Sequence, residues 1–136
     1  MSKILNYDTQ KPKDSPYAVT YTFPQVDFGA GDSTEVIAGH PDRVGYIQEV
    51  VVTRVTETFT TDTTEARVEV GDGTDPDYHV VSANLGALAA TESARPVLTP
   101  GVERNLGVQD ATVTFVAPTG GVPAGIADVS VTVLWF

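Results

Sequence analysis

The chain has 136 residues, a formal net charge of −10 and no cysteine. This length predicts one domain with a substantial core, and the lack of cysteine excludes disulfides and thiolate chemistry. The acidity argues against a sequence-independent nucleic-acid binder, because neutralising phosphates requires clustered lysine and arginine. No apolar run approaches the roughly 20 residues of a membrane span, and no signal peptide is recognisable. We therefore expect a soluble protein that is made in the cytoplasm.

Residues 1–16 are predicted to form an extended N-terminal arm, because they lack sustained periodicity and contain two prolines. Three of its residues are apolar enough to dock on a partner, and all three lysines of the chain lie within it. The candidate binding residues are thus Lys3, Ile4, Leu5, Tyr7, Lys11 and Lys13. From Ser15 onward the chain has five arginines and sixteen acids, a charge of −11. A weakly basic arm therefore precedes a strongly acidic body.

The first part of the body is predicted to form short strands. Alternating aromatic and polar residues indicate a strand at 17–23, and Pro24 either ends it or places it at a sheet edge. A short strand at 26–28, a turn at 29–32 and a further short strand at 34–38 follow.

Residues 45–60 carry the longest β-signal. Ile47 and Val55 share one parity, whereas Val50 and Val52 share the other, so no face is apolar throughout. A bulge near 50–52, or burial of both faces there, would reconcile this pattern. Residues 60–64 are predicted to be the turn of a hairpin, and 65–70 its returning strand.

The stretch from 71 to 110 is rich in turns. A turn at 71–77 precedes short strands at 78–81 and 95–98. Between them, 82–92 favours one or two helical turns, although Gly86 weakens the helix. Leu106 and Val108 then lead into the last two strands.

The last 26 residues have the clearest pattern. Two alternating segments, ATVTFVA and DVSVTVLWF, flank a connector rich in proline and glycine, which indicates a hairpin or a broader loop between two strands. Trp135 and Phe136 are predicted to anchor the core or an oligomer interface. The alternation of Trp135 with Val129, Val131 and Val133 favours burial in its own core.

About eight short strands with almost no helix predict an all-β fold, either a β-sandwich or a barrel, over residues 17–136. Valine and threonine, which are both β-branched, are abundant and support this prediction.

No residue set predicts catalysis or a bound metal. Asp72, Asp75 and Asp77 could supply oxygen ligands to calcium, but they do not fit an EF-hand loop, and tight turns also favour these residues. His40 and His79 are the only histidines, and the chain has no cysteine to complete a zinc site with them. We therefore expect no cofactor and no enzyme activity, while metal binding at the three aspartates stays open.

Two further interpretations concern acids and tyrosines. Glu57 and Glu65 flank the predicted hairpin, but a glycosidase would need a cleft around such a pair. Exposed tyrosines could bind glycans, although core or interface roles are equally consistent with the sequence. The tyrosines in question are Tyr17, Tyr21 and Tyr46.

Three segments together resemble small structural proteins of tailed bacteriophages. They are KPKDSPYAVTYTF, VEVGDGTDPDYHVVSANLG and ATVTFVAPTGGVPAGIADVSVTVLWF. In particular, the chain resembles the jelly-roll cement (decoration) proteins on the outside of icosahedral capsids.

This resemblance implies an antiparallel jelly-roll sandwich with an extended arm, which forms a homotrimer or similar cluster and performs no catalysis. The implied partner is the major capsid protein, whose neighbouring copies the protein would bridge. The predicted location is therefore the capsid exterior, with no nucleic acid or membrane as partner. Alternatives are another phage β-domain, from a tail, head-completion protein or fibre, and a small carbohydrate-binding module.

Overall fold

The structure is a computed structural model that describes residues 3–4, 15–103 and 105–136. The strands in these residues are β1 (Lys3–Ile4), β2 (Tyr17–Asp27), β3 (Ser33–Ile37), β4 (Gly45–Glu57), β5 (Arg67–Gly71), β6 (Val80–Asn84), β7 (Leu98–Pro100), β8 (Asn105–Gly107), β9 (Ala111–Val116) and β10 (Ile126–Trp135). One short 3-10 helix, η1 (Phe28–Ala30), separates β2 from β3. No helix in the described part of the chain is long and apolar enough to cross a membrane.

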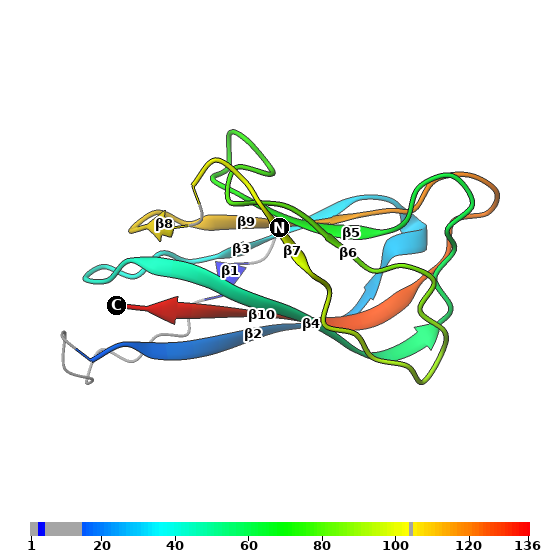
Figure 1. Ribbon diagram of the computed structural model, residues 1–136, viewed down its shortest axis with the longest axis horizontal. Coiled ribbons are helices and arrows are strands. Elements are labelled where there is room, and N and C mark those ends of the chain that lie inside the picture. Colours follow the sequence, from blue (N-terminus) through cyan, green and yellow to red (C-terminus); the bar gives the residue numbers. More distant parts are fainter. Residues whose placement is uncertain (1–2, 5–14, 104) are drawn as a thin grey trace.

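The strands form two sheets that pack face to face (Figure 1). One sheet has the order β2-β10-β4-β8, and the other has the order β1-β3-β9-β5-β6-β7. Four antiparallel pairs are nested along the chain: β2 with β10, β3 with β9, β4 with β8, and β5 with β6. First-with-last pairing of eight strands, divided between two sheets, is the topology of a jelly roll. The predicted β-sandwich is confirmed, and the nested pairing is that of the jelly roll implied by the resemblance.

The core lies between the sheets and is built from alternate residues of each strand. In β10 these are Ala127, Val129, Val131, Val133 and Trp135, all buried. From the opposite sheet, Val68, Val70, Val113 and Phe115 face them, also buried. β10 is paired on both sides, with β2 and with β4, so the strand with the clearest alternation is central.

Two bulges in β4 explain its mixed parity. The pairing with β10 shifts between Ile47 and Glu49, and again between Thr53 and Glu57. Each shift changes which parity faces the core, so Ile47, Val50, Val52 and Val55 are all buried. The predicted bulge is therefore present as two bulges, one on each side of 50–52.

Two local predictions are wrong. Residues 60–64 do not close a hairpin, because β4 and β5 lie in different sheets. The helical turns expected in 82–92 are absent: Ser82–Asn84 end β6, and the rest is a loop. This loop runs along β4, where Ala94 and Val52 exchange two main-chain hydrogen bonds and Thr91 N–H donates to Val55 O. Covering a sheet edge thus outweighed a weak helical propensity.

The loops that connect the strands lie at two opposite ends of the sandwich (Figure 1). At one end, the start of β2 and the end of β10 lie with the loops 38–44 and 108–110, where Gly39 N–H donates to Asp110. At the other end lie 28–32, 58–66 and 117–125, joined by bonds such as Phe28 N–H to Gly125 O.

Candidate functional site

Five side chains gather where β2 begins and β10 ends; we call them the terminal cluster: Tyr17, Tyr21, His40, Arg43 and Trp135. Trp135 is fully buried, and its indole N–H donates to the hydroxyl of Tyr21 at 3.2 Å. Gly45 fits beneath the indole, because a Cβ there would lie 2.6 Å from a ring carbon. The structure therefore places Trp135 in the core of its own chain.

Phe136 differs from its neighbour, since its side chain is 48% exposed. Its main chain is nevertheless fixed, because Phe136 and Val44 exchange two hydrogen bonds, of 2.9 and 3.0 Å. Of the two predicted anchors, Phe136 is thus the one whose side chain is accessible to a partner.

Arg43 connects the residues just before β2 with the last residue of β10. Only 2% exposed, it donates from one guanidinium nitrogen to Ser15 O at 2.6 Å and to Trp135 O at 3.5 Å. The guanidinium carbon lies 4.7 Å from the centre of the Tyr17 ring, in cation–π geometry. The last residues before β2 are therefore held to the end of β10 by a buried cation.

His40 completes this cluster in its neutral form. Its Nδ1 accepts the Asp42 N–H at 3.0 Å, so the ring proton of the neutral form is on Nε2. The ring is buried and lies 5.7 Å from Trp135, centre to centre. Burial lowers the pKa of His40, and the positive charge of Arg43 lowers it further, while Asp42 opposes both effects.

Most of the candidate arm residues fall outside the described part of the chain: Leu5, Tyr7, Lys11 and Lys13. Lys3 and Ile4 form β1, which pairs in parallel with Val36 and Ile37 of β3. β2 begins at Tyr17, immediately after the predicted arm.

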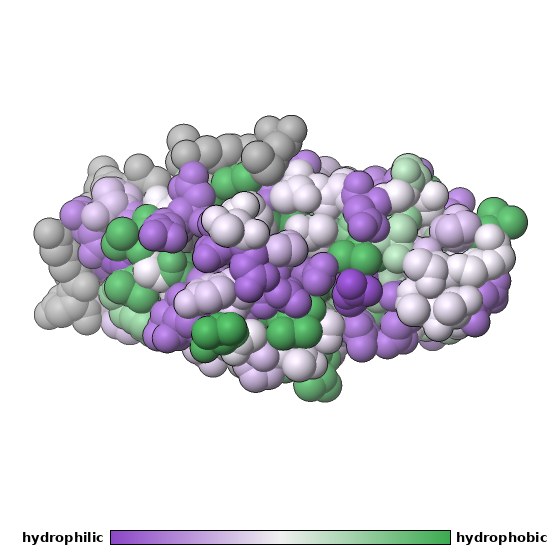
Figure 2. Space-filling view, turned by 90° about the horizontal axis from the view of Figure 1, so that it is seen from above, coloured by the Kyte–Doolittle hydropathy of each residue, from purple (hydrophilic) through white to green (hydrophobic). Residues whose placement is uncertain are grey.

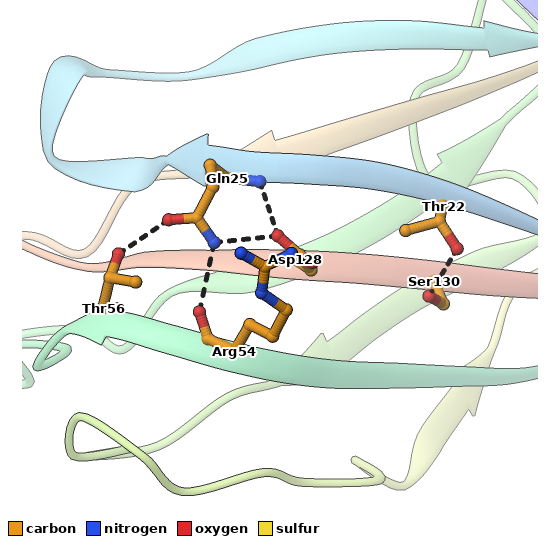
Figure 3. Close-up of polar contacts among 6 residues, drawn as sticks. All are labelled: Thr22, Gln25, Arg54, Thr56, Asp128 and Ser130. Atoms are coloured by element: carbon orange, nitrogen blue, oxygen red, sulfur yellow. Dashed lines mark hydrogen bonds and ion pairs between the residues drawn. The ribbon is translucent and has the colours of Figure 1, made fainter.

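A second polar group crosses three strands at the opposite end of β10 (Figure 3); we call it the Asp128 network, formed by Gln25, Arg54, Thr56 and Asp128. Asp128 Oδ1 accepts both the main-chain N–H and the side-chain amide of Gln25, each at 2.8 Å. The same amide donates to Arg54 O at 3.1 Å, and its oxygen accepts the Thr56 hydroxyl at 2.8 Å. β2, β10 and β4 are thereby connected through one glutamine.

The network lies where the backbone is strained. Gln25 and Arg54 have φ of +45° and +50°, a region that residues with a side chain rarely adopt. Both lie at register shifts, in β2 and β4 respectively, on either side of Asp128. Strained backbone and bulges are concentrated at functional or structurally critical sites, so this region is notable.

The charge of Asp128 is stabilised where it lies. Although only 6% exposed, its carboxylate has a pKa below the ordinary value, chiefly because Gln25 donates two hydrogen bonds to it. Arg54, whose side chain is 74% exposed, lies 3.7 Å from Asp128 Oδ2 and contributes less. Beyond the network, hydroxyl pairs continue along β2 and β10: Thr22 with Ser130, and Thr20 with Thr132, each at 2.9 Å.

The aspartates of the 71–77 turn bond to the main chain. Asp72 Oδ1 accepts the N–H groups of Thr74 and Asp75, which lowers the pKa of Asp72. Asp75 accepts more weakly from Asp77 N–H, at 3.4 Å. Within the described residues, no group of three or more histidines or acids is placed to hold a metal ion.

The other candidate residues are dispersed. Glu57 accepts Gly125 N–H at 3.0 Å, and Glu65 lies beyond the end of β4 in the loop that crosses to the other sheet, so the two acids do not flank a hairpin. His79 is buried, and its Nδ1 bonds to Glu103 O. Tyr21 is buried, Tyr17 is half-exposed with its ring against Arg43, and Tyr46 is half-exposed on the outer face of its sheet.

No role is predicted from the sequence for Arg43, Gln25, Arg54 or Asp128. Asp128 carried a usable signal, because it is a lone acid at an outward position of a strand rich in valine. Arg43 carried none, since an arginine after a turn is ordinarily solvated.

Similarity to known proteins is found among solved structures only. No family model matches the sequence, and no curated protein does. Among solved structures, a chain titled "Cyanophage Pam1 capsid asymmetric unit" is similar, with a TM-score of 0.44 and 15% sequence identity. The match covers 96% of this chain and 93% of that chain. A likeness at this level supports no conclusion about function.

Proposed function

We propose that this protein is a virion structural protein, which binds the outside of an icosahedral phage capsid and stabilises it by bridging major capsid proteins. The proposal rests on the resemblance of three sequence segments to cement proteins and on the jelly-roll topology. In this role the protein performs no catalysis.

The observation that carries the proposal is the fixed position of Ser15, near the end of the predicted arm 1–16. Arg43 fixes Ser15 to Trp135, so the chain just before β2 is held beside the end of the central strand. An arm that transmits force between capsid subunits needs such a fixed origin. Each exposed lysine pair with the capsid contributes at most about 1 kcal/mol, so the affinity must come from buried area and from several arms acting together.

The body of the protein has a surface suited to contact with solvent on the outside of a capsid. Figure 2 shows that the face above the six-stranded sheet is mainly hydrophilic, with apolar residues scattered over it. Three apolar or amphipathic positions at the end with the terminal cluster are accessible to a second copy: Val44, Val108 and Phe136. We propose a homotrimer that covers this end.

Deletion of residues 1–14 tests the proposed function. The truncated protein should lose most of its occupancy on expanded capsids of the phage that encodes it, measured by co-sedimentation. Its far-UV circular dichroism should change little, because the deletion removes, of the described strands, only the two-residue β1, while Arg43 and Ser15 remain. Full occupancy without the arm would overturn the proposal.

A charge variant separates the contribution of the arm's lysines to capsid binding from that of its apolar residues. Replacing Lys3, Lys11 and Lys13 by glutamine keeps Ile4, Leu5 and Tyr7, and should weaken binding less than the deletion does. Native mass of the free protein distinguishes a trimer from the hexameric ring of a tail-tube protein. A glycan array tests the carbohydrate alternative, for which Tyr17 and Tyr46 are the half-exposed tyrosines of the three.

A further inference from the structure

The outer face of the four-stranded sheet has a continuous set of outward side chains. Along β10, Ser130, Thr132 and Leu134 alternate with buried valines, so they point away from the core. Directly opposed residues of neighbouring strands share a face, and the partners of these three on β2 are Thr22, Thr20 and Ala18. We call these six residues the outer patch.

The outer patch is continued by an apolar group at the C-terminal end of β10. Phe136 has the same parity as Leu134, and it lies opposite Val44, with which it exchanges two main-chain hydrogen bonds. Phe136 and Val44 are 48% and 37% exposed, and Ala18, opposite Leu134, is exposed as well. Apolar residues that gather on one face, rather than lying singly, are typical of a protein contact surface.

The polar side chains of the outer patch bond to one another. Thr20 pairs with Thr132 and Thr22 pairs with Ser130, hydroxyl to hydroxyl, each at 2.9 Å; Figure 3 shows the second pair. Each pair satisfies one donor and one acceptor within the sheet. A partner that displaces water from these hydroxyls therefore meets a smaller desolvation cost than it would over unpaired polar groups.

The outer patch is uncharged, although the protein is strongly acidic. The acids beside it are paired with arginine: Glu49, opposite Thr132, lies 3.1 Å from Arg95, and Asp128 lies 3.7 Å from Arg54. The chain as a whole has a net charge of −10, so the excess of acids lies on other parts of the surface. Two copies therefore repel each other less at the outer patch than at a surface with unpaired acids.

We infer that the outer patch packs against the outer patches of other copies of this chain. In a closed symmetric contact, residues near the axis meet their own copies, so the contact surface must be compatible with itself. An uncharged patch meets this condition and an acidic face does not. A basic partner, by contrast, would be attracted to the acidic parts of the surface.

This contact extends the homotrimer surface proposed above from the end of the sandwich onto the sheet. A three-fold axis that runs along β10 brings three outer patches together, with Phe136 at one end of the contact. The inference does not depend on binding to a capsid.

Charge variants of the full 136-residue chain test this inference by analytical ultracentrifugation. Ala18→Glu and Thr22→Glu each place a carboxylate at an exposed position of the outer patch, where symmetry brings it near its own copies. Each should weaken self-association at least tenfold. Val97→Glu is the control, because Val97 is 88% exposed and precedes β7 of the other sheet, and it should leave association unchanged. Urea unfolding shows whether each variant is folded.

Salt gives a second measurement on the parent chain. Raising sodium chloride from about 20 to about 300 mM screens the repulsion between acidic surfaces, so association should strengthen about threefold or more. Association that weakens with salt would show that ion pairs hold the copies together, and the inference would be wrong.

Three other outcomes would overturn the inference. They are a monomeric parent, association of both patch variants equal to that of the control, and loss of association only in Val108→Glu, which would confine the contact to the end with the terminal cluster. None of these outcomes decides whether the protein binds capsids, because deletion of the arm and co-sedimentation measure that separately.

Discussion

The two ends of β10 are fixed by different kinds of interaction, although both ends lie between β2 and β4. At the C-terminal end, Trp135 is held by packing against aromatic rings and by a buried arginine. At the N-terminal end, Asp128 is held by hydrogen bonds from a glutamine in a strained conformation. The first end depends on close packing and the second on matched polar groups. Substitutions should therefore lower the free energy of unfolding most at the Trp135 end, where they leave a cavity. Acid should destabilise the two ends at different pH.

The largest effect is expected for Trp135→Ala. Removing a fully buried indole leaves a cavity, and we expect a loss of about 3–5 kcal/mol in the free energy of unfolding, measured in urea. Phe136→Ala is the matched control and should cost less than about 1 kcal/mol, because its ring is half exposed and its main-chain bonds remain. Similar losses for both variants would contradict the assignment of Trp135 to the core.

Arg43→Met should have the next largest effect. It leaves the buried carbonyl of Trp135 and the carbonyl of Ser15 without their charged donor, at a cost of about 1–3 kcal/mol. Hydrogen exchange in the first half of β2 should also accelerate, because Ser15 is released. Arg95→Met removes an exposed pair with Glu49 and should change neither stability nor exchange by a measurable amount.

At the other end of β10, Asp128→Ala should cost about 1–3 kcal/mol, since the Gln25 main-chain N–H and side-chain amide lose a common acceptor. Asp128→Asn keeps an acceptor oxygen and should lose less. If the two variants are equally unstable in urea, the negative charge rather than the hydrogen bonds holds this end together.

Lowering the pH should remove the stabilising contributions of the two ends of β10 in different pH ranges. The folded-state pKa of His40 lies below its ordinary value of 6.5, so its stabilising contribution is present above pH 6.5 and is lost as the pH falls below it. The pKa of Asp128 lies below 3.8, so its contribution persists to lower pH and is lost as the pH falls through that lower range. Relative to the parent, His40→Phe should remove the pH dependence of stability that begins below pH 6.5, and Asp128→Asn should remove the part that begins below pH 3.8.

The fluorescence of Trp135 gives an independent measurement at the first end, because it is the only tryptophan and lies 5.7 Å from His40. Protonation of His40 removes the Nδ1 acceptor used by Asp42 N–H, so the emission of the folded protein should change as the pH falls through the folded-state pKa of His40, which lies below 6.5. An emission change centred at or above pH 6.5 would contradict the lowered pKa of His40.

The two central strands, β10 and β4, illustrate which features of the fold the sequence pattern predicts. Period-two alternation identified β10 and the burial of Trp135, because side chains alternate strictly along a strand. The mixed parity of β4 predicted a bulge for the same reason. The hairpin at 60–64 was wrong because a short turn sequence does not indicate whether the next strand joins the same sheet. The Asp128 network was missed because its members are far apart in sequence and meet only through bulges, whose exact positions depend on pairing with β10.

The smallest and most specific effect concerns the strain at Arg54. Arg54→Ala and Arg54→Gly remove the same exposed ion pair with Asp128, which contributes at most about 1 kcal/mol. Alanine keeps the cost of φ near +50°, whereas glycine adopts this conformation without a Cβ clash. Arg54→Gly should therefore be more stable than Arg54→Ala by about 1 kcal/mol, despite the greater flexibility of glycine in the unfolded chain. The same pair of substitutions at Thr53, the adjacent position, which still pairs with Asp128 and has no positive φ, should show the opposite order, because glycine there weakens a strand. If alanine is the more stable at both positions, the bulge relaxes on substitution, and the strain belongs to the arginine side chain rather than to the pairing of β4 with β10.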